Sequence, residues 1–256
     1  MTDEGDYGVS DFGISPGAAA VPHPGPRPAP AASDPRFDLA AAMRRVTSAM
    51  VGLIVTDEEI AAATAAVTEV AQRLERVAAP GRRPRAQPDP VGDAQDFFPT
   101  SPVIGFANPV APPVVVEAVD GGLVGSAWFD NQYEGPPTCV HGGVLAMVFD
   151  EMLGAANIVS GNPGMTGTLT IRYRKPTPLR TRLRLEARFE GREGRKIRTT
   201  GAIYHGDLLT AEAEGIFIEL IPTRFMSIVV ENSDSPEDIE QVRADARRLG
   251  LVEGPT

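Results

Sequence analysis

The residues best suited to do chemistry lie together in one apolar stretch, 141–154, which reads HGGVLAMVFDEMLG. Its apolar residues fall on all sides of a helix, and this pattern predicts burial. Two carboxylates, Asp150 and Glu151, interrupt the stretch, and a buried carboxylate is costly unless it has a partner or a function. Asp150 is therefore a candidate functional acid. Either acid could instead point to solvent, because adjacent helical residues lie ~100° apart.

The start of this helix has the features of an anion or oxyanion site. His141 is followed by Gly142 and Gly143, whose amides no side chain covers. The first amides of a helix lack intrahelical acceptors and carry a partial positive charge. Such amides bind anions or stabilise the oxyanion of a polarised carbonyl. The alternative is a tight turn that needs the conformational freedom of glycine.

The spacing of Gly142 and Asp150 indicates a second copy of the chain. The two residues are eight positions apart, which is ~12 Å along a helix axis. A carbonyl bound to the Gly142 amide is therefore too far from Asp150 of the same helix to be attacked by a group held there. If both residues act together, one of them comes from another copy. The spacing predicts a dimer with composite sites.

The flanking residues predict the elements that hold this helix. The helix is expected over 144–159, after two strands joined by the turn Asp120-Gly121-Gly122. In 182–189 apolar and charged residues alternate with a period of two, as in a strand with one wet and one dry face. The expected strands are 114–119, 123–129, 168–174, 182–190, 196–204 and 210–220. This order predicts an α+β domain in which one long helix covers an antiparallel sheet.

Two helices are expected ahead of that domain, the first at 37–51. Thr56 and Glu59 form a capping-box pattern that starts the second helix. After this cap, apolar residues recur at helical spacing on one face: Ile60, Val67, Val70, Leu74 and Val77. We expect this apolar face to pack on the domain that follows or to support a dimer. A lid over an apolar tunnel is the alternative.

Composition divides the chain into five parts. Residues 1–35 form a tail rich in Pro and Ala, which we expect to be disordered because prolines remove backbone donors and large apolar groups are few. The other parts are a helical extension at 36–79, a Pro-rich linker or extended wrap at 80–113, the compact domain at 114–221 and a C-terminal helical extension at 222–256. The C-terminal part contains Ser235-Pro236, a pattern typical of a helix start.

Several motifs in the compact domain resemble the hot-dog-fold acyl-CoA thioesterases. They are His141-Gly142-Gly143 with Asp150 nine positions after the histidine, Met165-Thr166, YRKPTPL at 173–179 and YEGPP at 133–137. They are most similar to the branch that includes phenylacetyl-CoA-type enzymes and mitochondrial long-chain acyl-CoA thioesterases. The resemblance covers roughly residues 100–221. It implies a hot-dog fold, in which the antiparallel sheet wraps around one long central helix, here with added N-terminal and C-terminal helices.

The resemblance also implies roles in the hydrolysis of an acyl-CoA thioester to a free acid and CoA. Gly142 would donate its amide to the thioester carbonyl oxygen. Asp150 would activate water or attack directly, and Thr166 would help to place that water. His141 would shape the turn and orient the carbonyl site, without acting as a free general base.

One position departs from the family pattern. Some relatives have an asparagine six residues before the histidine, and this position is Gly135 here. Asn131 and Gln132 are the candidate substitutes. The attacking water is therefore expected to be placed differently.

A basic stretch follows the helix. Between 172 and 198 there are eleven Lys or Arg residues against three acids, and such a charge attracts anionic ligands. Because the phosphates of coenzyme A are anionic, Arg174 and Lys175 are candidate contacts for them, together with Gly143 at the helix start. The alternative is a solvated sheet face. RNA is disfavoured because the stretch has few aromatic residues on which bases could stack.

The composition of the whole chain excludes other classes. Lys plus Arg total 24 and Asp plus Glu total 34, and the net charge of −10 disfavours nucleic-acid binding. The single cysteine, Cys139, excludes an internal disulfide framework and a thiolate zinc cluster. We expect Cys139 to be a buried small hydrophobe, since no third group is evident to orient a Cys-His pair. No residue set suggests a metal, and no cofactor is expected beyond the coenzyme A of the substrate.

The expected function is acyl-CoA hydrolysis by a cytoplasmic homodimer or dimer of dimers. No run approaches the ~18 apolar residues that a membrane span requires, and the acidic N-terminus lacks the layout of a secretion signal. The alternative is a non-catalytic acyl-CoA-binding or sensing module that acts through its N-terminal helices. A hot-dog hydratase is disfavoured because its usual catalytic histidine placement is not seen. An α/β-hydrolase is disfavoured because no Gly-x-Ser-x-Gly elbow occurs.

Overall fold

The computed structural model describes residues 35–78, 99–112 and 114–221, with scattered positions between 227 and 244. The tail expected at 1–35, apart from Pro35, lies outside the described residues. So does most of the C-terminal extension expected at 222–256.

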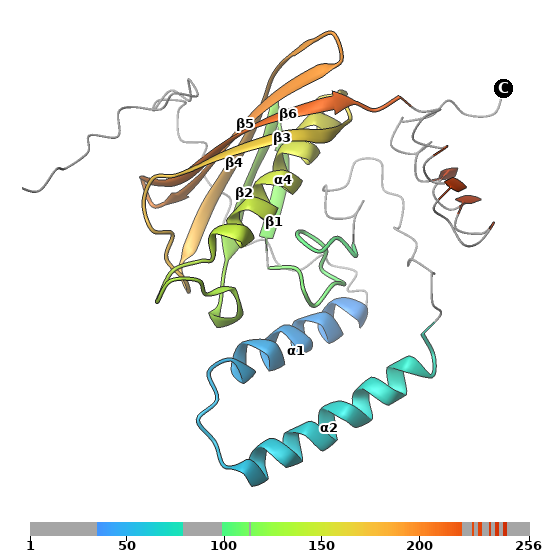
Figure 1. The fold of residues 1–256 in the computed structure, drawn as a ribbon, viewed down its shortest axis with the longest axis vertical. Coiled ribbons are helices and arrows are strands. Elements are labelled where there is room, and N and C mark those ends of the chain that lie inside the picture. Colours follow the sequence, from blue (N-terminus) through green and yellow to red (C-terminus); the bar gives the residue numbers. More distant parts are fainter. Residues whose placement is uncertain are drawn as a thin grey trace, which may run out of the picture.

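The compact domain is built on a six-stranded antiparallel sheet with the strand order β1-β2-β4-β5-β6-β3 (Figure 1). The strands are β1 (Val114–Val119), β2 (Gly122–Trp128), β3 (Gly164–Tyr173), β4 (Arg182–Glu193), β5 (Lys196–His205) and β6 (Leu208–Glu219). All six expected strands are present, because alternating side chains and turn residues are local signals that the sequence carries directly. The α+β class is confirmed. Strand β3 lies at one end of the sheet and pairs only with β6.

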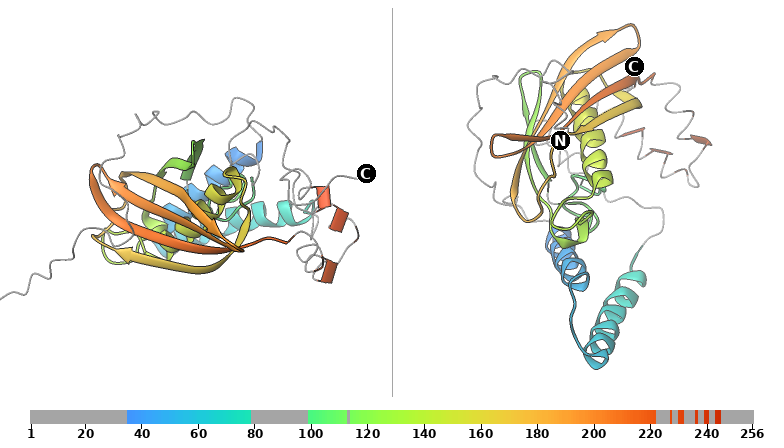
Figure 2. Two further views of the ribbon diagram at one scale, coloured as in Figure 1. Left: turned by 90° about the horizontal axis from the view of Figure 1, so that it is seen from above. Right: turned by 60° about the vertical axis from the view of Figure 1, so that its left-hand side comes forward.

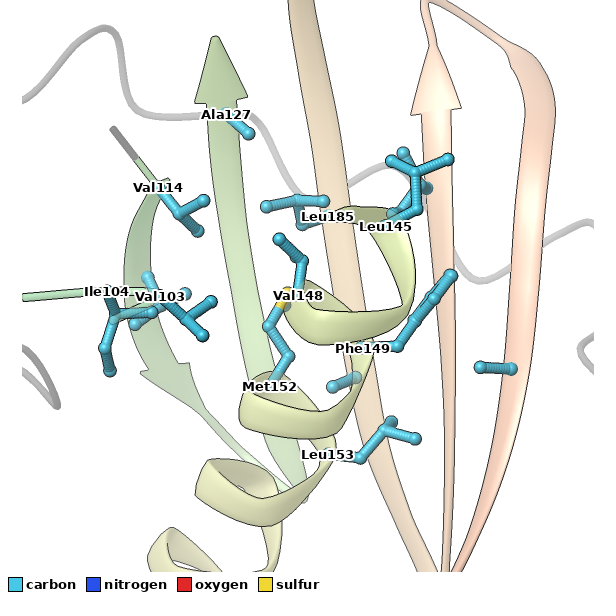
Figure 3. Close-up of a cluster of buried hydrophobic side chains, with 14 of the residues drawn as sticks. Val103, Ile104, Val114, Ala127, Leu145, Val148, Phe149, Met152, Leu153 and Leu185 are labelled. Carbon is cyan, nitrogen blue, oxygen red and sulfur yellow. The ribbon is translucent and has the colours of Figure 1, made fainter. Parts of the chain in front are cut away.

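Helix α4 (Gly142–Val159) is the central helix, and the sheet curves around it (Figures 1 and 2). Leu183, Leu185 and Ala187 of β4 belong to the same buried cluster as Val148 and Phe149 of α4 (Figure 3). Each fully buried Leu or Phe side chain stabilises the fold by ~1.5–3 kcal/mol relative to an exposed one. This cluster fixes the helix that carries the candidate acid.

The helix approaches the sheet closely because β5 has a glycine beneath it. A Cβ atom at Gly201 would lie 2.9 Å from Cδ2 of Leu153, which is closer than real side chains pack. A larger residue here would push α4 outward, and overpacking of this kind costs ~1–3 kcal/mol.

Residues 99–112 pack against the core. Val103 and Ile104 are 3% and 2% exposed and join the buried cluster (Figure 3). The amide of Ala107 donates to the carbonyl of Pro99 at 2.8 Å, which closes a compact loop. In the part of the chain expected to be a linker or wrap, these residues form one wall of the domain.

Helix α1 (Pro35–Met50) docks on this wall. Ala40 is buried, the Phe37 and Phe106 rings lie 5.7 Å apart, and Nη1 of Arg44 donates to the Asn108 carbonyl at 2.9 Å. Helix α2 (Asp57–Glu75) then starts at the expected capping box, in which the Glu59 amide donates to Thr56 Oγ1 at 3.3 Å and the Thr56 amide to Glu59 Oε2 at 2.9 Å.

Helix α2 does not pack on its own domain. None of its residues is buried, and Figure 1 shows it standing apart from the sheet, beyond α1. The expectation that its apolar face covers the following domain is therefore wrong for the single chain. The reason is that the capping box and the helix propensity are satisfied locally, whereas the position of the helix depends on contacts that the chain alone does not provide.

Among the described residues, one helix, α4, has the length and apolar composition needed to cross a bilayer. It is the helix that the sheet wraps, and the core helix of a domain passes the same test of length and composition.

Candidate active site

Asp150 lies on α4 and is held by the edge strand. The Thr166 hydroxyl of β3 donates to Asp150 Oδ1 at 2.7 Å. The pairing register of β3 with β6 shifts between Thr166 and Thr168, so Gly167 is an extra residue. Such a bulge re-aims neighbouring side chains and commonly occurs beside functional sites. The structure thus brings together two residues, Asp150 and Thr166, that the family resemblance implies for the site.

The expectation that Asp150 is buried is wrong in the single chain, where its side chain is exposed. The sheet covers one side of α4 and residues 99–112 cover another, so the third side stays open next to β3. Met165 and Tyr173 on this strand are also 55% and 54% exposed. The apolar residues on all sides of α4 predicted that the whole helix is buried. In a single chain, the side that carries Asp150 is not covered.

Glu151 is the more buried of the two acids. Its Oε1 accepts a hydrogen bond from Ser101 Oγ at 2.8 Å, beneath the loop 99–112. Burial raises the pKa of Glu151, the nearby Asp150 raises it further, and the Ser101 hydrogen bond opposes both effects. Ser101 Oγ in turn accepts from the amides of Val103 and Ile104. Glu151 therefore anchors the loop to α4.

The start of α4 leaves one amide available. His141 is the N-cap, and its Nδ1 accepts from the Gly143 amide at 2.9 Å. Within the described part of the chain, the Gly142 amide has no hydrogen-bond acceptor. The amide expected to meet a carbonyl oxygen is thus free, while the Gly143 amide is used by His141. This contact also agrees with the turn-shaping role expected for His141.

Tyr173 is a further site residue; it belongs to the motif at 173–179, but no role at the site was expected for it. Its hydroxyl donates to the Gly142 carbonyl at 2.9 Å, so the end of β3 is tied to the start of α4. A Cβ atom at Gly142 would lie 3.4 Å from Cζ and Oη of Tyr173. Because 31 residues separate the two positions, no local pattern indicated this contact.

Gly135, at the position where some relatives have an asparagine, has no room for a side chain. A Cβ atom at Gly135 would lie 2.7 Å from Cα of His141. The same loop is closed by bonds from the Gly135 amide to Cys139 and from the His141 amide to Tyr133. Of the two candidate substitutes, Asn131 faces Gly52 near the end of α1, and Gln132 Oε1 is buried without a partner in the described residues.

Arg174 and Lys175 differ sharply in their surroundings. Nε and Nη2 of Arg174 both donate to Oε1 of Glu212, whose side chain is fully buried. Arg174 is thereby committed to an ion pair inside the domain, which conflicts with the phosphate-binding role expected for it. Lys175 is exposed two residues after Tyr173. Other arginines of the basic stretch also have acidic partners: Arg184–Glu186, Arg192–Glu219 and Arg198–Glu214.

Cys139 is half-buried, so the expected full burial is wrong. Its Sγ lies 4.0 Å from Thr138 Oγ1. Because His141 Nδ1 is occupied by the Gly143 amide, the described contacts do not form a Cys-His pair. No group of three or more potential metal ligands occurs among the residues that the structure describes.

Comparisons with known proteins show the family of the chain. A family model described as Thioesterase superfamily matches residues 138–213, which include every site residue from His141 to Lys175. A crystal structure of a thioesterase superfamily protein is 33% identical, with a TM-score of 0.66, and the alignment covers 75% of this chain and 94% of that chain. The chain belongs to the thioesterase superfamily.

Curated relatives of this thioesterase superfamily member match a shorter region. Acyl-coenzyme A thioesterase THEM4 of Xenopus laevis is 37% identical over 91 residues, and that of Mus musculus is 36% identical over 93 residues. These matches cover 35% and 36% of this chain. The chain spans 41% and 40% of the length of these relatives.

The site thus contains two chemical groups, an amide and a carboxylate, at different positions along helix α4. A free amide at Gly142 can donate to a polarised carbonyl oxygen. A carboxylate at Asp150, held by Thr166, can take a proton from water or attack an electrophile. Eight residues of helix, ~12 Å, separate them within one chain.

Proposed function

We propose that this protein hydrolyses acyl-CoA thioesters to a free carboxylic acid and CoA. The proposal depends on one observation: Asp150 is hydrogen-bonded to Thr166 on the open side of α4, while the Gly142 amide has no acceptor among the described residues. The names of the curated relatives support an acyl-CoA substrate. The reaction needs no cofactor beyond the coenzyme A of the substrate.

In the proposed reaction the Gly142 amide donates to the thioester carbonyl oxygen and stabilises the negative charge that develops there. Asp150 removes a proton from a water molecule that Thr166 helps to place, and the water oxygen attacks the carbonyl carbon. The carbon–sulfur bond then breaks, and the CoA sulfur leaves as a thiolate that takes up a proton. Direct attack by the Asp150 carboxylate, with water cleaving the resulting anhydride, is the alternative route.

The Gly142 amide and the Asp150 carboxylate that meet one thioester would belong to two copies of the chain. Among the strands that the structure describes, β3 has an unpaired edge beside the exposed Asp150. An unpaired edge is a template for pairing with another strand. A two-fold axis beside this edge would give two equivalent sites, each with an amide from one protomer and an acid from the other. Burial of Asp150 would then be completed by the second copy.

The direct test is turnover of an acyl-CoA panel, followed by the appearance of free CoA thiol. Asp150→Asn should lower kcat by at least ~10²-fold, the lower end of general-base contributions. Glu151→Gln is the matched control, because it changes the neighbouring acid, which faces the loop 99–112. Near wild-type turnover by Asp150→Asn would refute the assignment. Bound acyl-CoA that is recovered intact by mass spectrometry would indicate the binding or sensing module instead.

A mixing experiment tests the composite site. Gly142→Pro removes the amide proton at a helical position that tolerates proline, and Asp150→Asn removes the acid. Each variant alone should be inactive. After the two are denatured and refolded together, half of the dimers contain one intact site, so about a quarter of the wild-type activity should return. No recovery, with dimers present, would contradict the composite site.

A further inference from the structure

The exposed face of α2 has the spacing of a coiled-coil seam. Its four large apolar residues, together with Ala63 and with Val77 in the turn that follows the helix, are separated alternately by three and four positions, as are the a and d positions of a heptad. These residues are Ile60, Ala63, Val67, Val70, Leu74 and Val77. Val67 and Val70 are each 41% exposed and Val77 is 79% exposed. We call this set the α2 seam.

Within the described residues, exposed large apolar side chains are concentrated in the part of the sequence that contains α1 and α2. Nineteen large hydrophobic residues are exposed in the described part of the chain; twelve of them lie between Leu39 and Val77, and five of these twelve belong to the α2 seam. Single exposed apolar residues are ordinary, but a contiguous concentration marks an interaction surface. In the loop before α2, Ile54 is 99% exposed.

Neither the domain nor α1 covers the seam. Helix α2 has no buried residue, and Figure 2 shows it projecting away from the domain. Helix α1 directs Ala40 and Arg44 toward the domain. Helices in proteins gain most of their stability when an apolar face packs against another element, and the described residues provide no such partner for the α2 seam.

We propose that the occupant is the α2 seam of a second copy, arranged antiparallel. The seam is complementary to itself in this arrangement, because a and d positions of one helix face d and a positions of the other. With the two-fold axis between Val67 and Val70, each Val67 meets a Val70 of the other helix. Ala63 then faces Leu74, and Ile60 faces Val77. All six positions are used, and the small Ala63 is opposite the large Leu74.

The charges on α2 favour the antiparallel direction. Asp57, Glu58 and Glu59 occupy its first turn. Its end carries Arg73, Glu75 and Arg76, a net charge of +1, and Arg73 also pairs with Glu69 of the same helix. Antiparallel pairing places the acidic start of one helix beside the basic end of the other, and each helix dipole meets its opposite. Parallel pairing would instead place the two acidic starts together.

This contact is separate from the open face of the proposed site. The site uses α4 and β3, whereas the seam lies on α2, beyond α1 (Figure 1). The α2 pair therefore adds a second interface to the assembly and does not depend on any step of the reaction. A 19-residue helix provides a contact of ~28 Å in length.

The first test is the molar mass of the full-length protein in solution, by analytical ultracentrifugation. Val67→Asp with Val70→Asp introduces charge into the centre of the seam. The matched control, Ala65→Asp with Gln72→Asp, adds the same charge to the opposite face of the same helix. The seam variant should halve the mass of the assembly, while the control keeps the wild-type mass and both keep thioesterase turnover. Equal masses for all three proteins would overturn the proposal.

The second test fixes the direction by cross-linking, in a Cys139→Ser background. Ile60→Cys with Val77→Cys should give a covalent dimer on oxidation, because these positions face each other between copies. Ile60→Cys alone should give none, since a symmetric cross-link at this position requires parallel helices. Cross-linking by Ile60→Cys alone would contradict the antiparallel arrangement.

The alternative occupant of the seam is a lipid surface, which binding to phosphatidylcholine–phosphatidylglycerol vesicles tests. If the seam variant loses vesicle binding without a change in mass, the seam binds lipid instead and the proposal is refuted.

Discussion

Thr166 Oγ1 donates to Asp150 Oδ1 at 2.7 Å and thereby joins the edge strand β3 to the central helix α4. The bulge at Gly167 sets the direction of this strand beside the helix. The hydrogen bond fixes one carboxylate oxygen, and the other, Oδ2, has no hydrogen-bond partner among the described residues, so it can accept a water proton or attack an electrophile. Asp150 is exposed, so its orientation depends on this contact more than on packing.

Thr166→Val should lower kcat while KM changes little, because it removes the hydroxyl and keeps the shape of the side chain. A hydrogen bond to a charged group is worth ~1.5–3 kcal/mol, and this corresponds to a ~10- to 100-fold loss of rate. Thr166→Ser should recover most of the rate, since it restores the donor. Steady-state kinetics with one acyl-CoA substrate measure all three. If Thr166 acted only through strand packing, Thr166→Val would retain a higher kcat than Thr166→Ser.

Gly135→Ala should impair both stability and turnover. The added Cβ would lie 2.7 Å from Cα of His141, and a backbone contact of this kind is not relieved by side-chain rotation. We expect a loss of ~1–3 kcal/mol in the free energy of unfolding and a lower kcat, because His141 caps the helix that presents the Gly142 amide. Gly154→Ala is the control, since its Cβ would lie 3.7 Å from the Phe217 ring. This change should leave turnover intact and raise the free energy of unfolding by ~0.5–1 kcal/mol. Gly135→Asn, which introduces the asparagine that some relatives have at this position, should give turnover and stability no higher than those of Gly135→Ala.

The sequence predicted the elements of the domain because their signals are local. Alternation in β4 and the capping box at Thr56 are satisfied within a few residues, and both are present in the structure. The Asp150–Thr166 pair was implied by the family resemblance, since the chemistry of a known site restricts which strand meets the helix. No period or turn pattern identified it.

The sequence did not predict contacts between segments that are far apart along the chain. Tyr173 and Gly142 are 31 residues apart, and Arg174 and Glu212 are 38 residues apart. Nor did the sequence distinguish which acid would be more buried, because Glu151 owes its burial to the loop 99–112, whose composition resembled that of a linker. The burial of an amphipathic helix is likewise a property of the assembly, and α2 shows this most clearly.

Glu151→Gln should remove a pH-dependent loss of stability. Burial raises the pKa of Glu151 above its ordinary value, so the folded state retains this proton at pH values where the unfolded chain has released it. The contribution of Glu151 to stability is then greatest below the ordinary glutamate value and falls as the pH rises toward the raised value. The melting temperature of Glu151→Gln should therefore match that of the wild type in acid and exceed it at pH 8. The same substitution at the exposed Glu117 controls for the loss of one charge. A wild-type advantage that grows with pH would contradict the assignment.

Substitutions of the neighbouring residues Arg174 and Lys175 should have different effects: the first should lower stability, and the second should change KM. Arg174→Ala leaves the fully buried Glu212 side chain without its cation, and the loss of one partner of a buried ion pair costs ~3–5 kcal/mol. Arg174→Lys should recover only part of this stability, because Nε and Nη2 both donate to Glu212. Lys175→Ala should change the free energy of unfolding by less than ~0.5 kcal/mol. If Lys175 contacts the CoA phosphates, this variant should raise KM for an acyl-CoA and leave KM unchanged for an acyl-pantetheine, which lacks the nucleotide. An equal rise in KM for both substrates would place Lys175 beside the thioester rather than the phosphates.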